Sequence, residues 1–367
     1  MDNDKIAIIG IGKLGLCFAL ALEKKGYDVL GVDINPDYVE SLNNKKFDSP
    51  EPNVKSYLNA SENFLATNDI KEGIKFSDII FLFVATPSLE NGRYDHSQID
   101  RVVAELINCG PKKNKNLVIG CTTMPGYCET IQDRLNAYGY TISYNPEFIA
   151  QGSVMSDLVN PDILLIGQGS NYAGDLINRI YSSIVENNPS IHKMNLKEAE
   201  ITKISLNCFL TTKIAYANMI GDIAKSSNCN PDTILNAIGS DKRIGNKNLK
   251  YGYGFGGPCF PRDNRALALF AEDIQLDAVI SKASDQSNKL HLDYQFKEFL
   301  KNNHKSKPIT FSNVAYKLGT DIIEESQKLK LAIRLLDEGY TIIINDTKRV
   351  IDQIKDKYKK NFKYLEL

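Results

Sequence analysis

The stretch Lys5-Ile6-Ala7-Ile8-Ile9-Gly10-Ile11-Gly12-Lys13-Leu14-Gly15 decides the fold of this chain. Lys5–Ile9 is almost wholly apolar, as expected of a buried parallel strand, and three glycines follow in the spacing Gly-x-Gly-x-x-Gly. A helix is expected next over Leu16–Lys25, and then a second strand over Tyr27–Val32 that ends at Asp33. This order of strand, glycine turn, helix and strand is the context in which such glycines bind dinucleotides. The sequence therefore predicts a Rossmann-like α/β unit with a parallel sheet.

The three glycines and Asp33 suit different parts of a dinucleotide. Gly10 permits a tight turn, Gly12 lets the pyrophosphate approach the backbone, and Gly15 allows close helix packing. Asp33 lies 18 positions after Gly15, where a carboxylate accepts hydrogen bonds from ribose hydroxyls and repels a 2′-phosphate. NAD is therefore favoured over NADP, and the flanking elements argue against the alternative of an α/β turn without a ligand. The predicted cofactor residues are Gly10, Gly12, Lys13, Leu14, Gly15 and Asp33.

Polar clusters follow three further apolar runs. The runs are expected to be strands at 78–84, 116–120 and 140–143, and the clusters contain Thr86, Thr123 and Glu147. Ligands bind at the carboxyl edge of open parallel sheets, where these clusters are expected to lie. Either threonine alone would be read as a helix cap, but three clusters on one edge favour a site. Glu147, between a proline and an aromatic residue, is a candidate carboxylate with a shifted pKa.

A long helix is predicted over Leu196–Lys225, with a kink expected at Gly221. Lys203 and Asn207 stand four positions apart on it, so both side chains leave one face. An ammonium beside an amide can position a hydroxyl and stabilise an oxyanion. Such a pair is usually solvated surface, but the apolar neighbours favour a packed helix whose polar pair needs partners. These neighbours are Ile204, Leu206, Cys208 and Phe209.

The loop Gly252–Asp263 presents one thiol, Cys259, between a glycine-rich run and two prolines. Glycines allow close approach to a ligand, and prolines restrict the turn that carries the thiol. This setting favours a nucleophile that traps a carbonyl, with Asp263 nearby to manage protons. The alternative is a buried structural cysteine, because most cysteines behave as small apolar residues.

A polar, lysine-rich link over 301–307 precedes a second α/β pattern. Its strands are expected at 309–315, 340–345 and 362–367, and its helices at 325–339 and 349–360. The predicted fold is thus an α/β protein in three parts. These parts are a Rossmann-like domain at 1–195, a central long-helix dimerisation domain at 196–300 that holds the cysteine loop, and a short C-terminal α/β domain at 301–367.

Composition limits the range of functions. The net charge of −1 over 367 residues gives no basic footprint for nucleic acid, and no apolar stretch is long enough to span a membrane. Seven scattered cysteines without a CxxC motif fit free thiols in a reducing compartment, so a cytoplasmic location is expected. Four scattered histidines show no metal-ligand spacing, so no metal is expected.

Taken in order, the motifs resemble those of the UDP-glucose/GDP-mannose dehydrogenase family, most closely its UDP-glucose 6-dehydrogenase branch. The resemblance runs from Lys5 to about Asp346. The matching residues are Gly10 to Gly15, Thr86-Pro87, Thr123-Met124-Pro125-Gly126, Asn145-Pro146-Glu147-Phe148, Lys203 with Asn207, Arg243-Ile244-Gly245, the Gly254-to-Asp263 loop, and Ala315-Tyr316-Lys317 with Thr320-Asp321.

The resemblance implies a four-electron oxidation that consumes two NAD and turns the carbon-6 alcohol of a nucleotide sugar into a uronic acid for polysaccharide biosynthesis. Cys259 would add to the aldehyde and carry a thioester, and Lys203 would stabilise oxyanions. Asn207 would hold the substrate, and Asp263 would orient the lysine or assist proton transfer. Glu147 and Thr123 would position or activate water, while Thr86 and Thr123 would also meet the cofactor. The implied substrate residues are Phe148, Ile149, Gln151, Lys203, Asn207, Arg243, Lys250, Tyr251, Tyr253, Gly254, Phe255, Gly256 and Lys317.

Arg243 would reach the substrate of a neighbouring subunit, which implies a homodimer. Three positions depart from the family pattern: Ile163 and Glu324 stand where an arginine is usual, and Arg262 replaces a lysine. The C-terminal part is also short. Substrate choice is therefore open between UDP-glucose and another UDP- or GDP-sugar. Two rival functions are a two-electron dehydrogenase of a small hydroxy acid and a nucleotide-sugar-binding protein without turnover.

Overall fold

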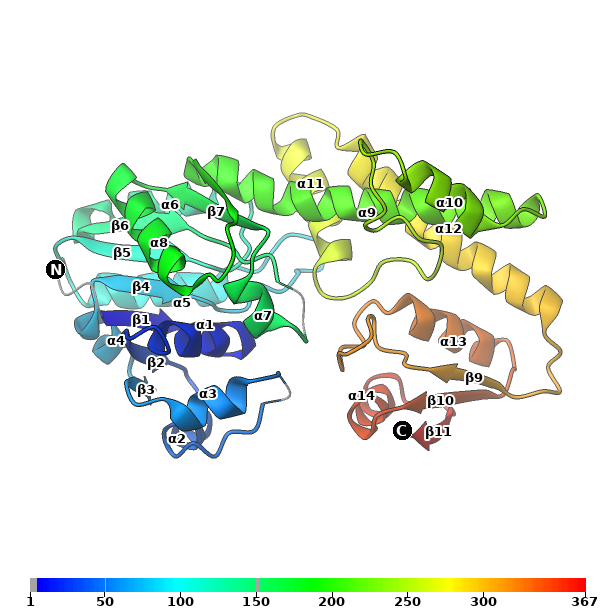
Figure 1. The fold of residues 1–367 in the computed structure, drawn as a ribbon, viewed down its shortest axis with the longest axis horizontal. Helices are drawn as coiled ribbons and strands as arrows, with labels where there is room; N and C mark the ends of the chain where they lie inside the picture. Colours follow the sequence, from blue (N-terminus) through cyan, green and yellow to red (C-terminus); the bar gives the residue numbers. More distant parts are fainter. Residues whose placement is uncertain (1–4, 50, 150–151) are drawn as a thin grey trace. The chain divides into compact units, whose positions relative to one another are not determined.

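The computed structural model describes residues 5–49, 51–149 and 152–367. The chain divides into two compact units, Met1–Lys203 and Ile204–Leu367, which are described separately below (Figure 1). The finer division into three domains with boundaries at 195 and 300 stays a prediction. Within the described ranges, no helix is both long and apolar enough to cross a membrane.

The first unit is built on an eight-stranded sheet in the order β3-β2-β1-β4-β5-β6-β7-β8. Strands β1 to β6 run parallel, whereas β7 is antiparallel to β6 and pairs in parallel with β8. The five strands predicted in this unit are present, which confirms the Rossmann-like sheet. The strands are β1 (Lys5–Ile9), β2 (Asp28–Val32), β3 (Phe64–Thr67), β4 (Ile79–Leu82), β5 (Lys115–Ile119), β6 (Tyr140–Tyr144), β7 (Ile163–Gln168) and β8 (Ser190–Met194).

Nine helical segments accompany this sheet in the described part of the first unit. They are α1 (Lys13–Glu23), α2 (Pro36–Asn43), α3 (Val54–Ala60), α4 (Ile70–Phe76), α5 (Ser97–Asn108), α6 (Tyr127–Leu135), the 3-10 turn η1 (Asn136–Tyr138), α7 (Val154–Val159) and α8 (Asn171–Ile184). Alternate residues of β1 enter two different apolar clusters, Ile6 and Ile8 one of them and Ala7 and Ile9 the other. Both faces of the sheet are therefore buried, as parallel sheets require.

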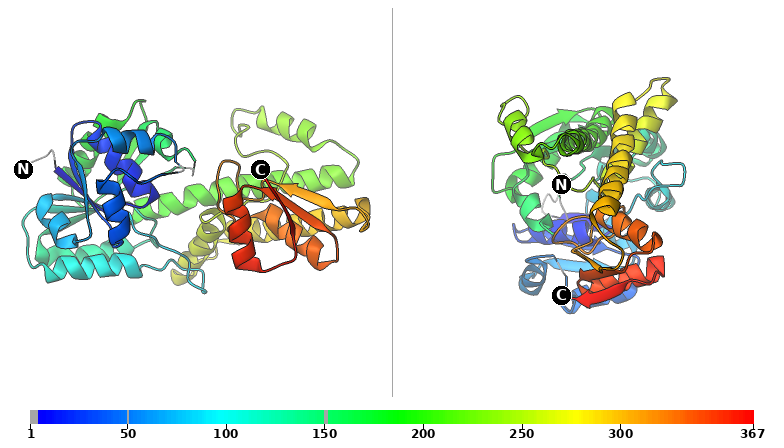
Figure 2. Two further views of the ribbon diagram at one scale, coloured as in Figure 1. Left: turned by 90° about the horizontal axis from the view of Figure 1, so that it is seen from below. Right: turned by 90° about the vertical axis from the view of Figure 1, so that its right-hand side faces the viewer.

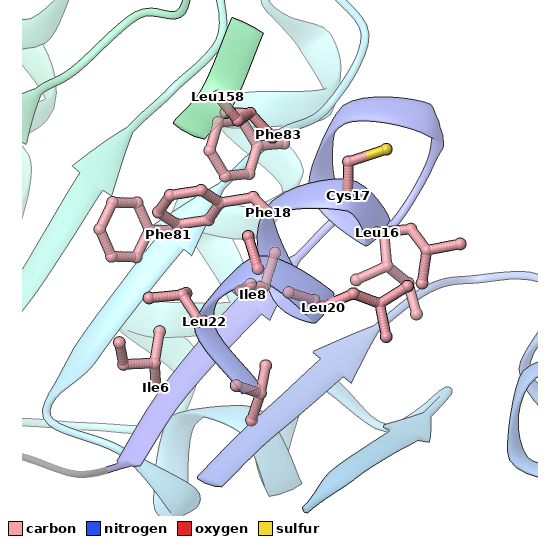
Figure 3. Packing of buried hydrophobic residues seen from close by; sticks show 14 of the residues in the cluster. Ile6, Ile8, Leu16, Cys17, Phe18, Leu20, Leu22, Phe81, Phe83 and Leu158 are labelled. Atoms are coloured by element: carbon pink, nitrogen blue, oxygen red, sulfur yellow. The ribbon is translucent and has the colours of Figure 1, made fainter. Parts of the chain in front are cut away.

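Helix α1 packs tightly on the start of the sheet. Phe18 lies 4.8 Å from Phe81 between ring centroids and reaches into the cluster that Figure 3 shows around Ile6 and Ile8. A Cβ atom on Gly15 would lie 2.0 Å from the carbonyl oxygen of Gly10, so only glycine allows this helix to approach the turn. The glycine spacing thus fixes the first turn of α1 directly against the end of β1.

The second unit joins long helices to a small parallel sheet (Figure 2). The predicted C-terminal α/β pattern is confirmed, with strand order β11-β10-β9. Helix α9 (Leu196–Ser226) begins in the first unit and continues into the second. The remaining elements are α10 (Pro231–Gly239), α11 (Phe260–Asp273), α12 (Val279–Asn302), β9 (Ile309–Ser312), α13 (Gln327–Asp337), β10 (Ile342–Asp346), α14 (Lys348–Tyr358) and β11 (Lys363–Glu366).

Gly221 does not interrupt α9, and the kink expected there stays a prediction. The helix continues to Ser226, and a Cβ atom on Gly221 would lie 1.9 Å from the ring of Tyr251. The glycine is explained by packing, because its missing side chain makes room for a tyrosine of the predicted substrate loop.

Candidate active site

The turn between β1 and α1 leaves room for a phosphate. Gly10 donates its N–H to Val32 at 2.8 Å, which ties the turn to β2. Gly12 precedes α1. Among the residues that the structure describes, no side chain caps this end of the helix, and a Cβ atom on Gly12 would meet nothing within 4 Å. Lys13 is exposed and Leu14 is half-buried in the first turn. This turn lies where the strand order reverses between β1 and β4. The open space in front of the helix N-terminus suits a pyrophosphate.

Asp33 directly follows β2 and keeps its carboxyl group partly exposed. Its Oδ1 accepts the N–H of Asn35 at 3.1 Å, and its own N–H donates to Thr67 at 3.1 Å. These contacts orient the carboxylate at the carboxyl edge of the sheet. The structure thus places Asp33 where the dinucleotide pattern requires an acid.

Thr123 is fully buried, and its hydroxyl donates to Glu200 of α9 at 2.7 Å. Glu200 also accepts the N–H groups of Gly126 and Cys128 at 2.6 and 2.9 Å. Burial raises the pKa of Glu200, and these hydrogen bonds oppose that rise. Sequence reasoning missed Glu200, which anchors the loop after β5. A direct contact of Thr123, or of the buried Thr86 after β4, with cofactor or water stays a prediction.

Glu147, Phe148 and Lys203 lie together in the first unit. The ammonium of Lys203 donates to the backbone oxygen of Glu147 at 2.6 Å and lies 4.2 Å from the ring centroid of Phe148. Lys203 is buried, so the expectation of a packed rather than a solvated lysine is confirmed. Ile149 packs against the core, and Gln151 lies outside the described residues.

The carboxyl group of Glu147 accepts a hydrogen bond from Tyr181 of α8. Burial raises the pKa of Glu147 to about 7, while the Tyr181 hydroxyl and the Lys203 charge act in the opposite direction. The raised pKa agrees with the expectation of a shifted carboxyl group at this position. A carboxyl group with a pKa near 7 suits proton transfer at neutral pH.

In the second unit, Asn207 and Asp263 form a buried pair. The amide of Asn207 donates to Asp263 at 2.6 Å, and Arg262 Nε lies 3.5 Å from the other carboxyl oxygen. Both members of the pair are buried. Because an isolated buried carboxyl group is unfavourable, these contacts of Asn207 and Arg262 help to satisfy Asp263 in the protein interior.

Cys259 precedes α11 at its N-cap position and is exposed, so the alternative of a buried structural cysteine is wrong. The N–H of Asp263 donates to the backbone oxygen of Cys259 at 2.9 Å and places the two residues one helical turn apart. The positive end of a helix dipole favours a thiolate over a thiol. The position therefore suits a nucleophile.

The backbone before Cys259 is held by its neighbours. Phe255 exchanges two hydrogen bonds of 2.9 Å with the side-chain amide of Asn288 of α12. Gly257 has a φ of +81°, and a Cβ atom there would lie 2.6 Å from the ring of Tyr316. Gly257 also donates to the backbone oxygen of Glu324 at 3.0 Å. Glu324 thus supports the cysteine loop through its backbone, while its side chain points to an exposed surface.

Tyr251 and Gly252 rest on a buried polar cluster that sequence reasoning missed. Tyr251 donates to Asp222 at 3.0 Å. His291 contacts Asp222 through Nδ1 at 2.8 Å and the oxygen of Gly252 through Nε2 at 2.7 Å. Of the other predicted loop residues, Gly254 and Gly256 are partly buried, whereas Lys250 and Tyr253 are exposed.

Arg243 and Lys317 are exposed on the second unit. The Arg243 guanidinium pairs with Asp241 at 2.6 Å on its own loop, and Lys213 of α9 holds the same loop by donating to Ile244 at 3.0 Å. Arg243 is therefore presented to solvent from an anchored loop.

Comparison with known proteins decides the family. Residues 4–185 match the NAD binding domain of the UDP-glucose/GDP-mannose dehydrogenase family, and residues 197–290 match its central domain. The chain belongs to the UDP-glucose/GDP-mannose dehydrogenase family. It is therefore an NAD-dependent nucleotide-sugar dehydrogenase, and the Gly12 turn and Asp33 fit the dinucleotide.

Several members of this family are similar to the chain over most of its length. UDP-glucose 6-dehydrogenase of Rickettsia prowazekii is 30% identical over 91% of this chain and 78% of its own length. GDP-mannose 6-dehydrogenase of Pseudomonas putida is 27% identical over 93% of this chain and 80% of its own. The structure of a UDP-glucose dehydrogenase from Pyrobaculum islandicum matches with a TM-score of 0.90 and 26% identity, over 99% of this chain and 86% of the other.

The family model that matches residues 4–185 is an NAD binding domain. Among the described residues, no group of three or more His, Cys, Asp and Glu side chains is arranged to hold a metal ion.

NADP is expected to be used at least about a hundredfold less well than NAD, because the Asp33 carboxylate repels a 2′-phosphate. The ratio of kcat/KM for the two cofactors measures this preference. Asp33→Ala should lower the ratio of kcat/KM for NAD to kcat/KM for NADP. Asp37→Ala, at the start of α2, should leave this ratio unchanged. Comparable efficiencies of the wild-type enzyme with both cofactors would contradict the role given to Asp33.

Proposed function

We propose that this enzyme oxidises the carbon-6 alcohol of UDP-glucose to the carboxylate of UDP-glucuronate, with two NAD for each sugar. The observation that carries the proposal is the exposed thiol of Cys259 at the N-terminus of α11. Asp263 follows one helical turn later and forms a buried pair with Asn207. A two-electron alcohol oxidation needs no thiol, whereas oxidation beyond an aldehyde benefits from one. The similarity to UDP-glucose 6-dehydrogenases supports the choice of sugar.

In the first half of the proposed reaction the alcohol becomes an aldehyde. Bound NAD supplies the hydride acceptor in both oxidation steps. Lys203, with its ammonium already positioned by the Glu147 backbone oxygen, is proposed to stabilise the developing alkoxide charge. Asn207 is proposed to hold the substrate, and Asp263 fixes the Asn207 amide and assists proton transfer.

In the second half Cys259 is proposed to attack the aldehyde carbon. A sulfur–carbon bond forms and the carbonyl oxygen takes a proton. Loss of a second hydride, with NAD as the acceptor, and loss of the hydroxyl proton to a base then leave a thioester. Glu147 then takes a proton from water as the water oxygen bonds to the thioester carbon, and the carbon–sulfur bond breaks. The uronic acid and the Cys259 thiolate are released. The acid loses its proton to give the uronate, and Glu147 passes its own proton to solvent, so both side chains return to their starting states.

Two alternatives have less support. A two-electron hydroxy-acid dehydrogenase would not use the exposed Cys259, and a binding protein without turnover would not need the whole set of Cys259, Lys203, Asn207, Glu147 and Asp263. Other sugars remain within the family chemistry, as the similarity to a GDP-mannose 6-dehydrogenase illustrates. A panel of UDP- and GDP-sugars assayed with NAD by NADH absorbance tests the choice. UDP-glucose should give the highest kcat/KM, and a higher value for a GDP-sugar would overturn the substrate assignment.

A homodimer is proposed from the exposed face of α9. Phe209, Tyr216, Met219 and Ile223 are 66, 45, 43 and 56% exposed, and their steps of seven, three and four positions place them on one stripe. A second copy of the chain would bury this stripe by two-fold symmetry. In this dimer, Arg243 is proposed to enter the site of the partner.

Arg243→Ala is expected to raise the KM for the nucleotide sugar while the protein stays folded and dimeric. Mixing Arg243→Ala with Cys259→Ala should restore activity, because some heterodimers then hold one site with both residues intact. Lys242→Ala, a neighbouring change on the same exposed loop, is the matched control. No gain in activity after confirmed subunit exchange would show that Arg243 does not act across the dimer.

A cytoplasmic location is proposed from the thiols. All seven cysteines are free in the structure, as expected for a protein in a reducing compartment.

A further inference from the structure

The carboxyl group of Glu147 has a dedicated partner in Tyr181, a residue from a part of the chain outside the recognised motifs. Tyr181 belongs to α8 and is 1% exposed. Its ring packs on Phe18 of α1 at 5.6 Å between centroids, inside the apolar cluster of the first unit. Its hydroxyl donates to Oε1 of Glu147. The tyrosine is therefore held rigidly by the core and presents one polar atom to the loop after β6.

The direction of this hydrogen bond is fixed by chemistry. Burial and the nearby Glu147 carboxyl group raise the pKa of Tyr181 well above its ordinary value, so the phenol stays protonated. A protonated phenol can donate to a carboxylate, and the bond favours the ionised form of the acid.

We propose that Tyr181 is the positioning residue of Glu147: its hydroxyl fixes one carboxyl oxygen and leaves the other to act on water. The proposal rests on the proposed role of Glu147 in thioester hydrolysis. Tyr181 would act through Glu147 and would not touch the substrate. Glu147 is then held by two hydrogen bonds. Tyr181 donates to its carboxyl group, and Lys203 donates to its backbone oxygen.

The groups around Glu147 determine in which direction its pKa should move when Tyr181 is changed. Burial raises the pKa of Glu147 to about 7, and the groups that lower it are Tyr181 from α8 and Lys203 from α9. Removal of the Tyr181 hydroxyl takes away one stabilising contact of the carboxylate, so the pKa of Glu147 should rise further. A base must be ionised to accept a proton, so the acid limb of hydrolysis should move to higher pH.

The test is a direct titration of Glu147 in the wild type, Tyr181→Phe and Tyr140→Phe, by NMR of 13C-labelled glutamate in the full chain. The signal is assigned by its loss in Glu147→Gln. Phenylalanine keeps the ring packing, and Tyr140→Phe removes another buried hydroxyl, which has no hydrogen-bond partner in the described structure. The midpoint should rise by roughly one pH unit in Tyr181→Phe, the size expected of one hydrogen bond, and stay unchanged in Tyr140→Phe.

An unchanged midpoint in folded Tyr181→Phe would overturn the proposal. So would equal shifts in Tyr181→Phe and Tyr140→Phe, because they would show a general effect of core substitution. The pH profile of turnover is measured in parallel. If the Glu147 titration moves in Tyr181→Phe and the acid limb of hydrolysis does not, the link between Tyr181 and Glu147 stands and the hydrolytic role of Glu147 fails. If thioester hydrolysis is absent from the wild type itself, the proposed function fails independently of the titration.

Discussion

Replacing Cys259 by serine is expected to lower production of the uronate by at least about a thousandfold, the scale on which loss of a nucleophile acts in covalent enzymes. A serine hydroxyl is a far weaker nucleophile than a thiolate at neutral pH, and an ester would hydrolyse more slowly than a thioester. NAD affinity should stay nearly unchanged, because Cys259 and the Gly12 turn belong to different units. Steady-state NADH formation and a fluorescence titration with NAD measure the two properties.

Cys229→Ser is the matched control, because Cys229 is also an exposed, free thiol of the second unit. It should retain wild-type turnover. If Cys259→Ser turns over UDP-sugar to the uronate as fast as Cys229→Ser, the covalent mechanism is wrong.

Lys203→Met is expected to lower kcat by about 10²- to 10³-fold, the usual effect of removing one group that stabilises a developing oxyanion. Methionine keeps much of the aliphatic length and removes the charge. The Lys203 ammonium is already held by the Glu147 backbone oxygen at 2.6 Å, so little reorganisation is needed when charge develops. Single-turnover kinetics at saturating sugar and NAD measure the chemical step directly.

Lys197→Met is the control on the same helix. Lys197 forms a surface ion pair with Glu129 at 2.6 Å, and loss of such a pair has little effect on stability. Thermal unfolding of both variants shows how much of any loss of activity comes from lower stability. A kcat for folded Lys203→Met within about twofold of the Lys197→Met value would rule out electrostatic stabilisation by Lys203 on this scale.

Much of the fold could be predicted because its elements carry strong local patterns. Residues that are neighbours in the sequence determine the apolar run of β1, the glycine turn and the uninterrupted helix α9. Strand β8 was missed because its residues are largely exposed and show no buried alternation. The packing role of Gly221 could not be predicted, because the ring of Tyr251 that it accommodates lies 30 positions away in the sequence.

Candidate site residues could be named from motifs, and their roles stay predictions, whereas the contacts that support them could not be predicted. Motifs identified Cys259, Glu147 and Lys203. The partners Glu200 and Tyr181 lie 77 and 34 positions from the residues they hold, and spacing along the chain carries no signal for such pairs. Glu200 stands among Lys197, Glu198 and Thr202, so its sequence looks like that of a solvated helix face, and its burial is seen only in the structure.

The most direct test of the four-electron reaction is the number of NADH molecules formed for each UDP-glucose consumed. The assay uses limiting UDP-glucose, excess NAD and an endpoint absorbance reading, with the product identified by mass spectrometry. We predict two NADH for each sugar and UDP-glucuronate as the product. One NADH for each sugar, with the aldehyde released, would contradict the role of Cys259 and the proposed function together.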